Sequence, residues 1–103
     1  MSRLFNNDEL NTLKSGLNSW KFDGDNKAMS RGLKFNNFSE TMGFMMQIAI
    51  TADAIKHHPE WSNVYSSVWI KLTTHDAGGI TELDENLAKT IDKIALKLGA
   101  DSI

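Results

Sequence analysis

The chain has 103 residues, of which 41% are hydrophobic and 23% charged, and these values predict one globular domain over residues 1–103. A formal net charge of −2 argues against direct nucleic-acid binding by bulk electrostatics. The lack of cysteine excludes disulfide frameworks, thiolate zinc sites and cysteine nucleophiles. No apolar run approaches the roughly 20 residues of a membrane span. The segment 1–7 has no apolar signal core, so we expect a cytoplasmic protein that does not enter a membrane.

Residues 6–18 are expected to form a short helix, and the residues that follow are expected to form a β-hairpin. The leucines at 10, 13 and 17 fall on one helical face, and Asn6 with Glu9 resembles a capping box. Residues 20–22 and 29–38 then alternate between apolar and polar side chains. The turn-forming segment 23–26 separates them, which predicts the two strands of the hairpin.

A second helix is predicted from an N-cap at Ser39 to about Lys56, within the region closed by Pro59. Residues 42–50 contain one polar side chain, whereas a surface helix normally has a polar face. One side of this helix should therefore pack on the sheet, and the other side should meet a second copy of the chain. The prediction is a homo-oligomer, a dimer or a tetramer, assembled through helix 39–56. Burial of the helix within the monomer is the alternative.

The second half of the chain predicts two further strands and a last helix. Residues 64–65 and 68–74 are rich in β-branched and aromatic side chains, with Ser66-Ser67 as the turn between them. Even positions 68–74 share one face and odd positions 69–75 share the other. Thr81 is the expected N-cap of the last helix, with Asp84 at its third position.

The resulting order is α-ββ-α-ββ-α. It predicts an α+β fold of two layers, in which a four-stranded antiparallel sheet carries the helices on one face.

The candidate chemistry centres on the histidines, all three of which lie between positions 57 and 75. His57 and His58 close the second helix, and His75 ends a strand before a glycine-containing loop. Rings at the ends of elements are well placed for proton transfer near neutral pH. The alternative for His57 and His58 is a structural one, in which they cap the carbonyl groups at the end of the helix.

No metal site is predicted. Adjacent histidines point in different directions, and the chain contains neither a His-x3-5-His pair nor a cysteine.

Two carboxylates and two tryptophans could support the histidines. Asp53 precedes His57 by four residues and would share its helical face, where it could orient the ring; the alternative is a weak surface pair. Asp84 could equally be an acid that complements the helix dipole. Trp20 and Trp61 could border a flat ligand, although core packing is the more common role of tryptophan.

The motif Asp53-x3-His57-His58-Pro59-x-Trp61, followed by Thr74-His75 at the end of a strand, resembles the pterin-4a-carbinolamine dehydratases. The spacing of Phe35, Phe38, Met42 and Phe44 also fits, and the similarity extends from about residue 4 to residue 98. The resemblance implies a β2-α-β2-α unit with an additional N-terminal helix, in agreement with the order predicted above.

The resemblance also implies an activity. Members dehydrate 4a-hydroxytetrahydropterin to quinonoid dihydropterin in tetrahydrobiopterin recycling, and they need neither a metal nor an organic cofactor. His57 and His75 would be general acids on the two faces of the pterin, and His58, counted with them as catalytic, would mainly hold the substrate. The positions that would bind substrate or support the histidines are Asp53 (often Glu in the family), Pro59, Trp61, Thr74, Asp84 and Trp20.

Some animal members also act as dimerisation cofactors of a homeodomain transcription factor. A non-catalytic interaction module is therefore the second hypothesis, and the apolar segment 42–50 is compatible with either role.

Overall fold

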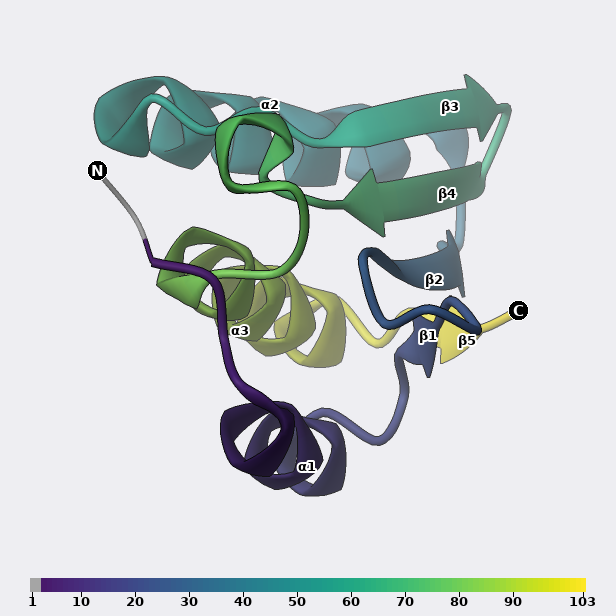
Figure 1. Cartoon of the computed structure of the whole chain (residues 1–103). Coiled ribbons are helices and arrows are strands. Elements are labelled where there is room, and N and C mark those ends of the chain that lie inside the picture. The colour runs from purple at the N-terminus through teal and green to yellow at the C-terminus, as the bar shows by residue number, and fades with distance from the viewer. Residues whose placement is uncertain (1–2) are drawn as a thin grey trace.

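The computed structural model describes residues 3–103 and shows an α+β fold of two layers (Figure 1). The three helices and the antiparallel sheet follow the predicted order. In Figure 1, α3 lies between α2, behind the upper strands, and α1 at the bottom of the view. The elements are α1 (Asn7–Gly16), β1 (Lys21–Phe22), β2 (Met29–Lys34), α2 (Phe38–Ile55), β3 (Glu60–Val64), β4 (Ser67–Leu72), the 3-10 turn η1 (His75–Ala77), α3 (Glu82–Lys97) and β5 (Asp101–Ser102).

The sheet has the strand order β1-β2-β4-β3, and a fifth short strand, β5, adds to β2. This fifth strand is a correction to the four-stranded prediction. β1 and β5 pair with different parts of β2, β1 at Ser30 and β5 at Leu33. Gly32 makes the close approach possible, because a Cβ atom there would lie 3.2 Å from the side chains of both Trp69 and Ile103. A two-residue strand is too short to show alternation in a sequence.

The core lies between the inner face of the sheet and the helices. Val68, Ile70 and Leu72 are at most 2% exposed, while Trp69 and Lys71 are exposed on the outer face, so the predicted alternation of β4 is confirmed. Phe44 of α2 is fully buried and contacts Phe35, with ring centroids 4.8 Å apart. No helix within residues 3–103 has the length and apolar character that crossing a membrane requires.

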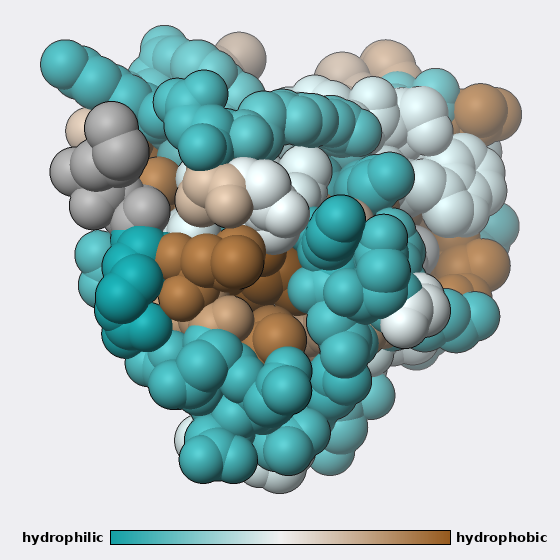
Figure 2. Space-filling view, in the orientation of Figure 1, coloured by the Kyte–Doolittle hydropathy of each residue, from teal (hydrophilic) through white to brown (hydrophobic). Residues whose placement is uncertain are grey.

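Figure 2 shows that this side of the molecule is largely hydrophilic. Hydrophobic atoms reach its surface in a central strip and at the right-hand end, near the β3–β4 hairpin. Val64 and Tyr65, at the end of that hairpin, are 66% and 63% exposed.

Several predicted boundaries are wrong. The strand predicted at 64–65 is β3, which runs from Glu60 to Val64, and the segment predicted as a strand over 29–38 leaves the sheet after Lys34. The second helix begins at Phe38 with Asn37 as its N-cap, because the Asn37 side chain accepts a hydrogen bond from the backbone N–H of Glu40 at 2.8 Å. Ser39 is therefore already helical, and asparagine serves as well as serine at an N-cap. The β3–β4 turn is Tyr65-Ser66, one residue earlier than expected, and Tyr65 adopts a positive φ of 52°.

The capping box at α1 is confirmed and provides a prediction about pH. The Arg3 guanidinium and the backbone N–H of Asn6 both donate to the Glu9 carboxylate, and they lower its pKa from an ordinary 4.5 to about 2. A depressed folded-state pKa means that this stabilisation is present above about pH 4.5 and disappears as the pH falls toward 2. Glu9→Gln should therefore flatten the acid-dependent loss of thermal stability between about pH 5 and pH 2.

Melting curves at several pH values, recorded by circular dichroism, check this prediction. Asp8→Asn is the matched control, because Asp8 is an exposed acid in the same helical turn. Parallel acid profiles for the wild type and Glu9→Gln would contradict it.

Candidate functional site

The end of α2 separates the two adjacent histidines. Lys56 adopts a left-handed conformation with φ of 57°, and its N–H bonds back to the carbonyl groups of Ala52 and Asp53. The chain turns sharply there, and Pro59 disfavours a helical conformation at the residue before it. As a result His57 is only 8% exposed, whereas the side chain of His58 is 68% exposed.

His57 is held by a buried network that starts at Asp84. The Nε2 atom of His57 lies 2.6 Å from Oδ1 of Asp84, which is completely buried. The other oxygen, Oδ2, accepts from the Thr74 hydroxyl at 2.8 Å and from the Thr81 N–H at 2.9 Å. Asp84, which caps α3, thus also holds the imidazole of His57 in place, and each carboxylate oxygen of Asp84 has a hydrogen-bond donor.

His75, in contrast to His57, is exposed to solvent. His75 was predicted to end a strand, but β4 ends at Leu72 and His75 begins η1. Before it, Thr74 forms an isolated bridge, in which its N–H bonds to the carbonyl of Gly79 at 2.9 Å. Nε2 of His75 lies 2.8 Å from Oε1 of Glu60, the first residue of β3. The side chain of His75 is 78% exposed, so both ring faces remain accessible.

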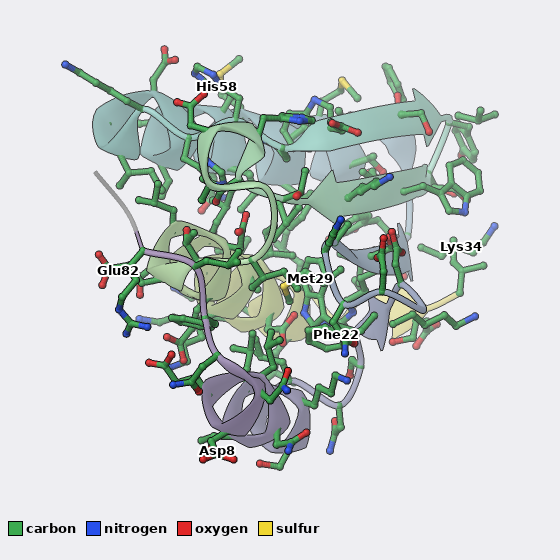
Figure 3. All side chains as sticks on the ribbon, viewed as in Figure 1. Asp8, Phe22, Met29, Lys34, His58 and Glu82 are labelled. Atoms are coloured by element: carbon green, nitrogen blue, oxygen red, sulfur yellow. The ribbon has the colours of Figure 1, made fainter. Side chains whose placement is uncertain are left out.

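All three histidines line one open depression of about 420 Å³. This volume lies within the roughly 300–1,000 Å³ range of small-molecule sites. Figure 3 shows His58 at the upper edge of the molecule, near the coil of η1. The same depression is lined by Lys56, Pro59, Glu60, Thr73, Thr74, Asp76 and Leu83. Within residues 3–103, no three histidine or carboxylate side chains converge to form a metal site.

The carboxylates have different partners from those expected on local spacing. Asp53 contacts His58 and not His57, with Oδ1 3.0 Å from Nε2 of His58. The helix ends at Ile55, so the four-residue spacing from Asp53 to His57 does not place them on one face. Asp84 has both roles considered for it, because it caps α3 and contacts His57.

Neither of the two predicted tryptophans, Trp20 and Trp61, lines the histidine depression. Trp61 packs against the core and borders a separate cavity of about 590 Å³, next to Trp69 on the outer face of the sheet. Trp20 is 5% exposed, and its indole N–H donates to Asp92 at 2.9 Å. Pro59 and Thr74 do line the histidine depression.

Sequence reasoning missed Glu60. Its position within His57-His58-Pro59-Glu60 was visible, but no helical or strand periodicity selects it. The contact with His75 depends on β3 pairing with β4, where Glu60 registers with Lys71. That long-range register is not encoded in any local spacing.

Comparison with known proteins gives consistent results. The family model for pterin 4 alpha carbinolamine dehydratase matches residues 3–94. A protein of Rhizobium rhizogenes, provisionally named as such a dehydratase, is 49% identical over 83 residues, covering 81% of this chain and 82% of the relative. A similarly named protein of Bordetella avium is 40% identical over 103 residues, covering 100% of this chain and 95% of the relative.

Two solved structures share the fold. A transcriptional coactivator/pterin dehydratase from Brucella melitensis superimposes with a TM-score of 0.84 at 40% identity, covering 90% of this chain and 98% of that one. A pterin dehydratase-like RuBisCO assembly factor of the alpha-carboxysome has a TM-score of 0.64 at 22% identity, covering 75% and 89%, and supports the fold alone. On the family match and these identities, the chain belongs to the pterin 4 alpha carbinolamine dehydratase family.

Proposed function

We propose that the protein dehydrates a 4a-hydroxytetrahydropterin to the quinonoid dihydropterin, as a step in tetrahydrobiopterin recycling. The observation that carries this proposal is the position of His57 and His75. They line the same depression, and each is hydrogen-bonded to a carboxylate. Such rings are suited to general acid catalysis near neutral pH.

The reaction requires a proton at the departing oxygen. A lone pair on the neighbouring ring nitrogen forms the C=N bond while the C–O bond breaks, and the imidazolium proton leaves with the oxygen as water. Release of the proton from that ring nitrogen then restores the charge of the imidazole. No covalent bond to the protein is needed. His57 would serve one face of the ring and His75 the other, so that both 4a epimers react. His58, supported by Asp53, would hold the substrate at the edge.

Turnover of a 4a-hydroxytetrahydropterin generated in the assay tests the proposal, with the spontaneous reaction in buffer as the reference. We expect dehydration, followed by ultraviolet absorbance, to be faster than the uncatalysed reaction by at least a hundredfold, which is about the lower end for acid–base catalysis. A folded protein that does not accelerate water loss would overturn the catalytic proposal. It would favour the non-catalytic interaction role, which the coactivator name of the Brucella structure suggests.

We also propose that the protein self-associates through α2. Phe38, Met42, Met46 and Ile50 recur every fourth residue and form one row along the helix, here called the α2 ridge. Phe38, Met46 and Ile50 are 47%, 62% and 64% exposed. Rows of this spacing interdigitate when two helices pack together, and a second copy of α2 would cover this apolar surface.

Met45 and Met46 differ in burial, and this difference decides which of them is suited to a test of the interface. Met46 is exposed, while Met45 packs against the core, so Met46→Glu adds a charge to the ridge without disturbing the monomer. We expect Met46→Glu to convert an oligomer into a monomer, because an unpaired charge in such a contact costs several kcal/mol. Light scattering after gel filtration measures the mass.

Leu96→Glu is the matched control, because Leu96 is 84% exposed on α3 and the change is of the same kind. It should leave the assembly intact. A wild type that elutes as a monomer of 11.5 kDa would contradict the self-association proposal.

A further inference from the structure

We infer that Glu60 is a positioning residue for His75. By accepting a hydrogen bond from Nε2–H, it leaves Nδ1 as the ring nitrogen that delivers the proton. This inference rests on the proposed dehydratase function and adds one residue and one atom to it. The evidence is the 2.8 Å contact between Nε2 of His75 and Oε1 of Glu60.

The contact joins two parts of the chain that the sheet already holds in place. Glu60 is the first residue of β3 and pairs with Lys71 of β4, while His75 begins η1 shortly after β4 ends. With both backbones fixed, one hydrogen bond is enough to select an orientation for the ring.

The contact is too exposed to contribute much to stability. The side chains of Glu60 and His75 are 50% and 78% exposed, and exposed pairs of this kind contribute about 0–1 kcal/mol. An imidazole this exposed would otherwise sample several rotamers, so the effect of Glu60 lies in the orientation of the ring. Misplacement of a reacting group by about 1 Å can cost up to about a hundredfold in rate.

The other two histidines show the same arrangement. Nε2 of His57 lies 2.6 Å from Asp84, and Nε2 of His58 lies 3.0 Å from Asp53. A carboxylate that accepts from one ring nitrogen fixes the tautomer and leaves the other nitrogen for the reaction. When Nδ1 gives up its proton, the ring keeps its Nε2–H bond to the carboxylate and does not need to turn over.

The first test needs no substrate. In the ¹⁵N-labelled protein, long-range proton–nitrogen correlation spectra distinguish the two neutral tautomers of His75. We expect the Nε2–H form to predominate in the wild type and in Glu60→Gln, whose side-chain oxygen also accepts a hydrogen bond. Glu60→Ala should give a mixture of tautomers. A wild-type ring in the Nδ1–H form, or a tautomer ratio that Glu60→Ala does not change, would overturn the inference whatever the activity of the protein.

The second test is a double-mutant cycle in the dehydratase assay. Glu60→Ala should lower kcat about tenfold with little change in KM, and Glu60→Gln should restore most of it. In a His75→Ala background, Glu60→Ala should have no further effect, because Glu60 acts through that ring. A further loss in that background, or an equal loss in Glu60→Gln and Glu60→Ala, would overturn the positioning role.

Glu82→Gln is the charge-matched control, because Glu82 is exposed in the first turn of α3 and does not line the histidine depression. It removes one negative charge without removing the contact to His75, and it should retain wild-type kcat. A loss as large as that of Glu60→Ala would assign the effect to the loss of negative charge and contradict positioning. A wild type without turnover but with His75 held in the Nε2–H form would count against the dehydratase proposal and leave the geometric one intact.

Discussion

The double variant His57→Gln, His75→Ala is expected to lose about 10²- to 10⁴-fold in kcat, because it removes both proposed general acids. Glutamine is chosen at position 57 because its amide nitrogen can still donate to the buried Asp84, whereas alanine would leave that carboxylate without a donor. His75 is 78% exposed, so alanine is tolerated there. Each single variant should lose at least about tenfold, and stopped-flow absorbance gives the rates.

His58→Ala is the matched control for this experiment, because His58 is the third ring in the same depression and is 68% exposed. In the proposed mechanism it holds the substrate, so its loss should raise KM more than it lowers kcat. Circular dichroism should show that all of these variants remain folded. Full activity in the folded double variant would overturn the assignment of both histidines.

Asp84→Ala is expected to lower the free energy of unfolding by about 3–5 kcal/mol, which is a large part of the stability of a domain of this size. The alanine variant leaves His57 and the Thr81 N–H without their acceptor, in a region where Thr81 is fully buried. It also removes half of the capping box of α3. Urea unfolding gives the free energies of unfolding. The free energy of unfolding of Asp84→Asn should lie between those of the wild type and Asp84→Ala.

Glu85→Ala provides the comparison, because it removes one carboxylate from the same first turn of α3. Glu85 forms only a surface pair with Lys89, at 3.2 Å, and its loss should cost less than about 1 kcal/mol. Similar losses for Glu85→Ala and Asp84→Ala would show that Asp84 acts only as a helix-start acid, and would contradict its role as the anchor of His57.

Local features of this protein could be predicted from the sequence because they depend on residues a few positions apart. The capping boxes of Asn6 with Glu9 and of Thr81 with Asp84 each span three residues, and both are present. The alternation of β4 needs only the two-residue period of a strand, and it correctly places Val68, Ile70 and Leu72 in the core. The N-cap at Asn37 could also have been recognised, since asparagine followed three residues later by Glu40 is a local signal.

The partners of the histidines were decided by the tertiary structure. Local spacing assigned Asp53 to His57, but the left-handed turn at Lys56 moved that ring inward, to Asp84, 27 positions away. His75 contacts Glu60, which lies 15 positions earlier in the chain, because β3 pairs with β4. The sequence by itself therefore determined the three helices, the two hairpins, their order and the positions of the histidines, but not the fifth strand. Which carboxylate holds each ring depends on helix termination and strand register, because both are set by packing over long sequence separations.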